Sequence, residues 1–114
     1  MMKDPTIYLE HIVESIELIE QYVGGLDQEK FLENVEKQDA VLRRISIIGE
    51  AVKNLPDEFR WIHEGIPWRR IAGMRDKVIH EYFGVDLQLV WTVAQENLPE
   101  LKKAIRSILK DSAR

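Results

Sequence analysis

Apolar residues recur at steps of three and four over most of the chain, the spacing that places them on one face of an α-helix. The clearest run lies between Asp4 and Gly24-Gly25. Asp4 before Pro5 is typical of a helix N-terminus, because aspartate accepts hydrogen bonds from the first turn and proline fits the first helical position. The glycine pair favours a stop. The stripe of this predicted helix consists of Leu9, Ile12, Ile16, Ile19 and Val23.

A second, longer helix is predicted from Asp27 to about Asn54, where Pro56 ends it. One polar residue, Gln38, interrupts its apolar stripe. A short helix or turn over residues 57–63 follows, and Gly65 is its stop. The apolar stripe of the long helix consists of Phe31, Val35, Leu42, Ile45, Gly49 and Val52.

Two further helices are predicted in the second half of the chain. Pro67 opens a helix over residues 68–83, which Gly84 ends. Asp86 is placed to cap the last helical stretch, and Pro99 kinks or restarts it. Strand signals are poor, because the chain has neither a convincing alternating run nor a hairpin dipeptide.

The chain has 114 residues, 45% apolar and 32% charged, which is typical of one globular domain. We therefore predict an all-α fold, a single-domain bundle of four to five helices over residues 1–114. The lack of cysteine excludes a disulfide scaffold, a Cys-based zinc site and a thiol nucleophile. No apolar run approaches the ~18 residues of a membrane helix, and the early acids are unlike a secretory signal. We therefore expect a soluble, cytoplasmic protein without a membrane partner.

Charge is distributed unevenly along this chain of net charge -4. Residues 1–40 carry ten acidic and three basic residues, a net charge of -7, and the remainder carries +3. Such segregation is as typical of ordinary solvated helix faces as of two electrostatically different surfaces. The acidic total argues against a nucleic-acid partner, but the basic remainder leaves room for a phosphate-facing surface.

Most kinds of active site have no support in the sequence. The three histidines form no His-x-x-x-His pair, and the glycines form no phosphate-binding loop, so we predict no metal site and no nucleotide-binding loop. Serine has no nucleophile-elbow context. The remaining candidate is the segment from Met74 to Tyr82. It contains a permanent cation, a titrating base and a phenol, namely Arg75, His80 and Tyr82.

Arg75 and His80 lie five residues apart, about 140° around a regular helix. A site that uses both side chains therefore requires two copies of the segment or a break near the end of the helix. The plain structural alternative stays open. In it Arg75 forms a surface ion pair, His80 lies near a helix C-terminus, and Tyr82 lies at the rim of the core.

The pattern Arg75-x-x-x-x-His80-x-Tyr82 resembles the signature of HEPN-domain proteins, specifically the HepT-like toxin family. Asp76 stands where the family often has Asn. The similarity covers roughly residues 4–110. Three further segments resemble family motifs: Ile48-Gly49-Glu50-Ala51, Ile66-Pro67-Trp68 and Val85-Asp86.

The resemblance implies an all-helical homodimer that cleaves RNA as an endoribonuclease without a metal or other cofactor. The two signature segments would meet at the dimer interface and place Arg75 and His80 of both chains in one cleft. The resemblance also implies that the protein belongs to a toxin–antitoxin system. The partner would be a cognate minimal nucleotidyltransferase, the antitoxin, which transfers AMP to Tyr82.

RNA cleavage by the ribose 2′-hydroxyl needs a base, an acid and positive charge at the phosphate. His80 suits the proton transfers, because the unperturbed pKa of histidine is ~6.5. Arg75 suits the phosphate through its fork of donors. AMP on Tyr82 would add bulk and negative charge where RNA must lie. The supporting candidates, each equally an ordinary solvated residue, are Asp76 and Glu50 beside Arg75, and Arg69, Arg70 and Lys77 for the RNA backbone.

A rival hypothesis belongs to another class of protein. The chain would be a non-catalytic helical partner, or a substrate-presenting subunit, of a nucleotidyltransferase. The acidic N-terminal helices and the Trp-bearing last helix would then form the docking surface. RNase activity that persists in EDTA separates the two hypotheses.

Overall fold

The computed structural model describes residues 4–80 and 84–112, with Ile79 and His80 described by their backbone alone. The first helix, α1 (Pro5–Val23), begins where the sequence predicts. The Asp4 carboxylate accepts a hydrogen bond of 2.9 Å from the Thr6 N–H. Hydrogen bonds to the Thr6 backbone and side chain lower the pKa of Asp4, because they favour its charged form. The helix ends at Gly24, and Gly25 has a positive φ of 80° that a glycine adopts without strain.

The predicted single helix from Asp27 to Asn54 is wrong, because the chain breaks at Asn34. Two helices, α2 (Gln28–Glu33) and α3 (Val35–Asn54), meet there. Asn34 has an extended backbone, and its side chain accepts a hydrogen bond of 3.0 Å from the Lys37 N–H, so it caps α3. Val35 consequently leaves the apolar stripe and is 65% exposed.

Gln38, the polar interruption of the long stripe, stabilises this break. It is buried, and its Nε2 donates hydrogen bonds to the carbonyls of Phe31 (2.9 Å) and Leu32 (3.0 Å). These carbonyls lie at the end of α2, where a helix leaves its last C=O groups without partners. The amide of Gln38 therefore replaces backbone bonds that a continuous helix would have made.

Three short helices follow. Helix α4 (Asp57–Ile62) lies where the sequence predicts a short helix or turn. The predicted helix over residues 68–83 is wrong, because it divides at Gly73 into α5 (Trp68–Ala72) and α6 (Met74–Val78) and then becomes extended. Strand β1 (Ile79–His80) pairs antiparallel with β2 (Gly84–Val85).

The last helical stretch is one continuous rod with an irregular turn in its middle. Helix α7 (Leu87–Thr92) passes through a π-helical turn, η1 (Val93–Asn97), into α8 (Leu98–Ser112). Pro99 is the second residue of α8. A proline removes one helical N–H and its ring crowds the carbonyl four residues earlier, and a π-turn is a known way to absorb that conflict. The predicted kink at Pro99 is therefore a widened turn just before it.

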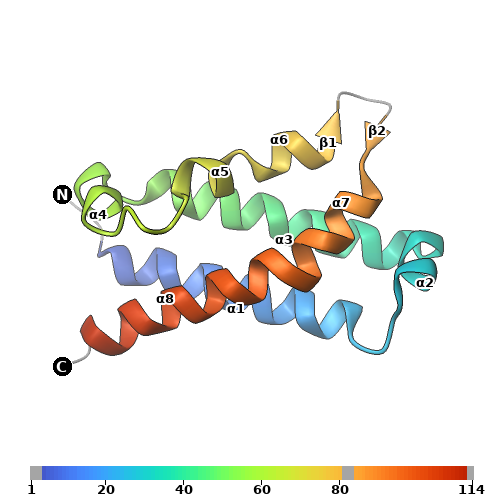
Figure 1. Cartoon of the computed structure of the whole chain (residues 1–114), viewed down its shortest axis with the longest axis horizontal. Helices are drawn as coiled ribbons and strands as arrows, with labels where there is room; N and C mark the ends of the chain where they lie inside the picture. Colours follow the sequence, from blue (N-terminus) through green and yellow to red (C-terminus); the bar gives the residue numbers. More distant parts are fainter. Residues whose placement is uncertain (1–3, 81–83, 113–114) are drawn as a thin grey trace.

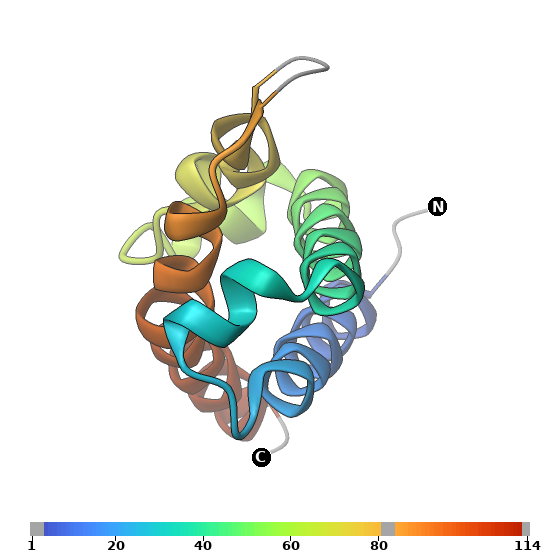
Figure 2. The ribbon, with the colours of Figure 1, turned by 90° about the vertical axis from the view of Figure 1, so that its right-hand side faces the viewer.

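The principal helices surround one core. In Figures 1 and 2, α1, α3, the α5–α6 segment and the α7–α8 rod form the sides of a bundle, and α2 lies across one end. The described residues form one buried apolar cluster, in agreement with the predicted single domain and mostly helical class. More helical segments are present than the four to five predicted, because of the breaks at Asn34 and Gly73. Within residues 4–80 and 84–112, no helix is long and apolar enough to span a membrane.

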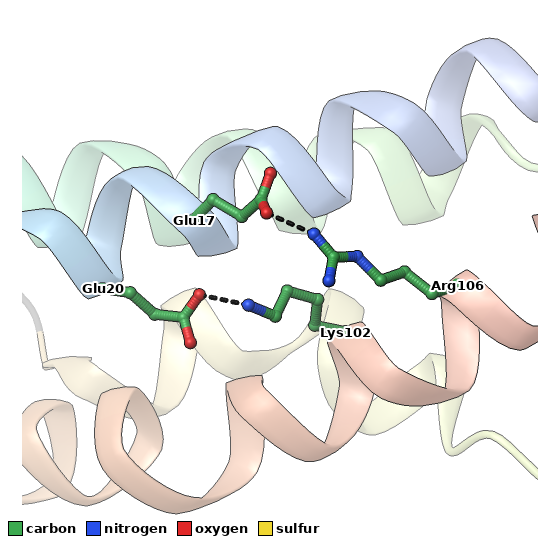
Figure 3. A network of polar contacts seen from close by, with 4 residues as sticks. All are labelled: Glu17, Glu20, Lys102 and Arg106. Atoms are coloured by element: carbon green, nitrogen blue, oxygen red, sulfur yellow. Dashed lines mark hydrogen bonds and ion pairs between the residues drawn. The ribbon is translucent and has the colours of Figure 1, made fainter.

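Two ion pairs join α1 to α8 (Figure 3). Glu17 pairs with Arg106 and Glu20 with Lys102. The two carboxylates are therefore engaged within the molecule, and part of the acidic excess of residues 1–40 is balanced by the basic second half of the chain. Ion pairs of this exposure contribute about 0–1 kcal/mol each, so they orient α8 more than they stabilise it.

Candidate functional site

Arg75, the cation of the signature segment, lies on α6. Gly73 begins this turn, because its carbonyl accepts hydrogen bonds from the N–H groups of Asp76 (3.1 Å) and Lys77 (3.2 Å). The Arg75 side chain is 54% exposed, and its nearest carboxylate oxygen among the described residues is on Asp76, at 3.6 Å. That distance is longer than a hydrogen bond, so the guanidinium keeps donors free for an anion.

The signature segment changes from helix to strand between Arg75 and His80. The Val78 carbonyl, which a continuing helix would offer to residue 82, accepts a hydrogen bond of 2.8 Å from the Asp86 N–H. Ile79 pairs with Val85 and His80 with Gly84. The break that the 140° separation requires is therefore present in the backbone of one chain. The side chain of His80 and the whole of Tyr82 lie outside the described residues.

Asp86 links the hairpin to the last helical rod. Besides the bond from its N–H to Val78, its carboxylate accepts a hydrogen bond of 3.0 Å from the Leu89 N–H and caps α7. The sequence predicts the cap but not the link to Val78, because nothing local marks a partner eight residues away. This link fixes where the strand of His80 starts relative to the core.

Gly49 explains the Gly-Glu motif on α3. A Cβ at this position would lie 3.2 Å from the carbonyl oxygen of Ala72, tighter than most such contacts, so glycine lets α3 approach the end of α5 without a shift of the backbone. The close approach packs α5 against the core and thereby positions Arg69 and Arg70, which are exposed. Glu50 is exposed on the other side of the helix, and no ion pair within the described part of the chain joins it to Arg75.

Arg69, Arg70 and Lys77 are exposed and line one open groove of about 600 Å³. No ion pair ties these three side chains to another residue that the structure describes. Arg60 of α4 lines the same groove, and sequence reasoning missed it because it lies nine residues before Arg69 on another helix. The groove therefore gathers basic side chains from three short helices, and it ends at Lys77, two residues after Arg75 in sequence; Arg75 itself is not part of its lining.

A second, mostly apolar cleft of about 420 Å³ lies between the α5–α6 segment and the α7–α8 rod. Arg70 and Lys77 line this cleft as well as the groove, so they form the ridge between the two hollows. In the part of the chain that the structure describes, no group of three or more His, Cys, Asp or Glu residues is arranged to hold a metal ion.

The fold and this basic segment define a small helical protein that presents cations beside an Arg-x-x-x-x-His motif. The chain belongs to the HepT-like ribonuclease family: the family described as "Ribonuclease HepT-like" matches residues 12–108. The resemblance inferred from the motifs is thereby confirmed. No solved structure matches the chain.

Named relatives agree with this family. A Thermococcus cleftensis protein named "Probable ribonuclease HepT" is 48% identical over 103 residues, 90% of this chain and 94% of the relative. A Caldanaerobacter subterraneus protein named "Putative RNase" is 48% identical over 109 residues, 96% of this chain and 97% of the relative. A Methanocaldococcus jannaschii protein named "Gamma-glutamylcyclotransferase and putative RNase" is 52% identical over 111 residues, 97% of this chain but only 50% of the relative. The chain thus spans half the length of that last relative.

Proposed function

We propose that this protein is a metal-independent endoribonuclease whose site combines Arg75 and His80. The observation that carries the proposal is the family match across residues 12–108 together with the helix-to-strand break between these two residues. In an unbroken helix the two side chains would point about 140° apart. Because the backbone becomes extended after Val78, that constraint does not apply to this segment.

The proposed reaction is attack of a ribose 2′-hydroxyl on the adjacent phosphate. A base removes the hydroxyl proton as the O2′–P bond forms, the P–O5′ bond breaks, and an acid returns a proton to the leaving 5′-oxygen. His80 is assigned to proton transfer and Arg75 to the charge that develops on the phosphate. Asp76 holds its carboxylate near Arg75, and Glu50 stays a candidate for support from α3.

In a homodimer, two copies of the segment would supply two histidines, so that base and acid are separate groups. Val85 of β2 is an apolar residue that is 39% exposed, and a second copy of the segment would cover it in such a dimer. Arg69, Arg70 and Lys77 are proposed to contact the RNA backbone, since they are exposed, have no ion-pair partner among the described residues, and line one groove.

The expected result for the purified protein is cleavage of single-stranded RNA in the presence of EDTA. The fragments should end in 2′,3′-cyclic phosphates, because the attacking oxygen belongs to the substrate. A 2′-O-methyl oligonucleotide of the same sequence, which has no free 2′-hydroxyl, should stay intact. Cleavage that depends on added Mg²⁺, or no cleavage at all, would contradict the assignment.

We also propose that the protein is the toxin of a toxin–antitoxin pair and that a minimal nucleotidyltransferase transfers AMP to Tyr82. With that enzyme and ATP, the intact mass should rise by one AMP group, and peptide sequencing should place it on Tyr82. The modified protein should lose RNA cleavage, because the AMP phosphate repels RNA. The Tyr82→Phe variant is the matched control and should stay unmodified. AMP on another residue, or undiminished cleavage after modification, would refute this regulation.

The rival role, a non-catalytic partner of a nucleotidyltransferase, has less support. Its docking surface relied on acidic N-terminal helices and a Trp-bearing last helix. Glu17 and Glu20 are engaged by α8, and the Trp91 ring lies 5.4 Å from that of Phe31, half-buried in the core. Two of the acids and the tryptophan that this docking surface relied on are therefore used within the molecule, and the family match favours the RNase proposal.

A further inference from the structure

Trp61 is the most exposed large apolar side chain of the described residues, at 73%. It lies on α4, whose six residues include no buried one. A large indole is normally placed in the core or at an interface, because its ring is costly to leave in water. Its neighbours Arg60 and Glu64 line the basic groove, so this exposed indole lies on the helix that forms one end of that groove.

Helix α4, which carries Trp61, is packed against the start of α5. The Phe59 ring lies 4.6 Å from that of His63 and 6.1 Å from that of Trp68. Trp68 is buried, and its Nε1 donates a hydrogen bond of 3.0 Å to the His63 carbonyl. Because this aromatic cluster joins α4 to the start of α5, the exposed indole is mounted on a packed helix rather than on a free loop.

The groove beside α4 is basic. Its charged lining consists of four cations and one carboxylate, namely Arg60, Arg69, Arg70, Lys77 and Glu64. Arg60 pairs with Asp57, and the other three cations have no ion-pair partner among the described residues. Cations gathered in this way attract a polyanion, and attraction of this kind weakens with salt.

The groove extends from Arg60 and Glu64, which flank Trp61 in sequence, to Gly73 and Lys77 at the signature segment. Figure 1 shows α4, α5, α6 and the β1–β2 hairpin following one another along one edge of the molecule. At 1.5 Å per residue, the α5–α6 segment is about 16 Å long, and at ~3.4 Å per stacked nucleotide this is the length of about five nucleotides.

We propose that this groove is a track for single-stranded RNA, with Trp61 as the platform on which an unpaired base stacks at its far end. The inference rests on the proposed function and adds where the substrate extends beyond the scissile bond. Single-stranded rather than duplex RNA fits, because stacking on an aromatic ring requires a base whose face is free. The cations along α5 and α6 contact the RNA backbone between that base and the signature segment.

The test uses 2′-O-methyl oligonucleotides, which bind without being cleaved. A single-stranded dodecanucleotide should quench tryptophan fluorescence, since Trp61 is exposed while Trp68 is buried and Trp91 half-buried. By anisotropy of the labelled dodecanucleotide, Trp61→Ala should bind roughly five- to a hundred-fold more weakly, and Trp61→Phe should retain most of the affinity. Arg69→Gln and Arg70→Gln should each reduce the slope of log affinity against log salt by about 0.7.

Matched controls are Val35→Ala, an exposed apolar residue on another helix, and Lys110→Gln, an exposed cation on α8. Both should bind like the wild type. Wild-type affinity in Trp61→Ala, or equal affinity for the duplex of the same sequence, would overturn the track. Because these oligonucleotides are not cleaved, the result is independent of the nuclease assay. If the wild-type protein does not cleave RNA but binds the oligonucleotide more tightly than Trp61→Ala does, the proposed reaction is rejected and the track stands.

Discussion

His80→Ala is expected to lower RNA cleavage by about 10²–10⁴-fold, the usual contribution of a side chain that transfers a proton in the transition state. The loss should appear in kcat more than in KM, because proton transfer stabilises the transition state and not the bound RNA. The measurement is single-turnover cleavage of a labelled RNA in EDTA. Circular dichroism of the variant should match that of the wild type, since His80 lies on the short β1–β2 hairpin.

Arg75→Ala is expected to cost about 10²–10³-fold, the typical effect of removing one preorganised donor from a developing negative charge. Its side chain is half exposed, and its one ion-pair contact among the described residues is the 3.6 Å approach of Asp76, so little of the described fold depends on it. Arg75→Lys keeps the charge but loses the planar fork of donors, so its cleavage rate should lie between those of the wild type and of Arg75→Ala.

Two exposed residues provide matched controls for these variants. His11→Ala on α1 removes a histidine far from the signature segment in sequence, and Arg43→Ala removes an arginine from α3. Both should cleave at the wild-type rate. If His80→Ala and Arg75→Ala also keep wild-type rates, the site is elsewhere in the molecule and the assignment of both residues is wrong.

The fold is predictable from the sequence wherever a signal is local. The start of α1 at Asp4-Pro5 and the end of α3 before Pro56 follow from single residues that either cap a helix or cannot continue it. The break at Asn34 was not predicted, because the apolar stripe continues through it. It depends on Gln38, whose amide bonds two carbonyls six and seven residues earlier, a contact that periodicity does not reveal.

In the candidate site, too, local signals are predicted correctly and contacts between residues distant in sequence are not. The motif places Arg75 on a helix correctly, but the helix was expected to continue to residue 83. Val78, Ile79 and Val85 are β-branched, a preference for extended structure that acts only when a partner strand is near. The partner strand is β2, and the hydrogen bond from the Asp86 N–H to the Val78 carbonyl holds it beside β1. The sequence pattern does not predict this bond.

Net charge is informative only after the fold is known. Two acids of the N-terminal region are used to orient α8, while cations of α4, α5 and α6 gather around one groove. The average over 114 residues is -4 and conceals this separation. A basic groove on α4, α5 and α6 is therefore compatible with an acidic protein.

Phe31→Ala is expected to lower the free energy of unfolding by about 3–5 kcal/mol, the usual cost of removing a fully buried phenylalanine. Phe31 is 0% exposed and packs its ring 5.4 Å from that of Trp91, so it joins α2 to α7. Because α7 follows directly on the hairpin, loss of this anchor should also loosen the strand of His80. Denaturant unfolding should show the loss, and the melting temperature should fall by roughly 10–25 °C for a chain of this size.

Val35→Ala is the matched control, because it shortens an apolar side chain four residues away that is 65% exposed. It should change the free energy of unfolding by no more than about 0.5 kcal/mol. Both variants must be compared at one protein concentration, since a dimer gains stability by mass action. A loss below about 1 kcal/mol in Phe31→Ala would mean that α2 is not anchored to α7 and that the Asn34 break rests on Gln38 alone. A Gln38→Leu variant would then unfold at far lower denaturant than the wild type, because the carbonyls of Phe31 and Leu32 would lose their only side-chain donor among the described residues.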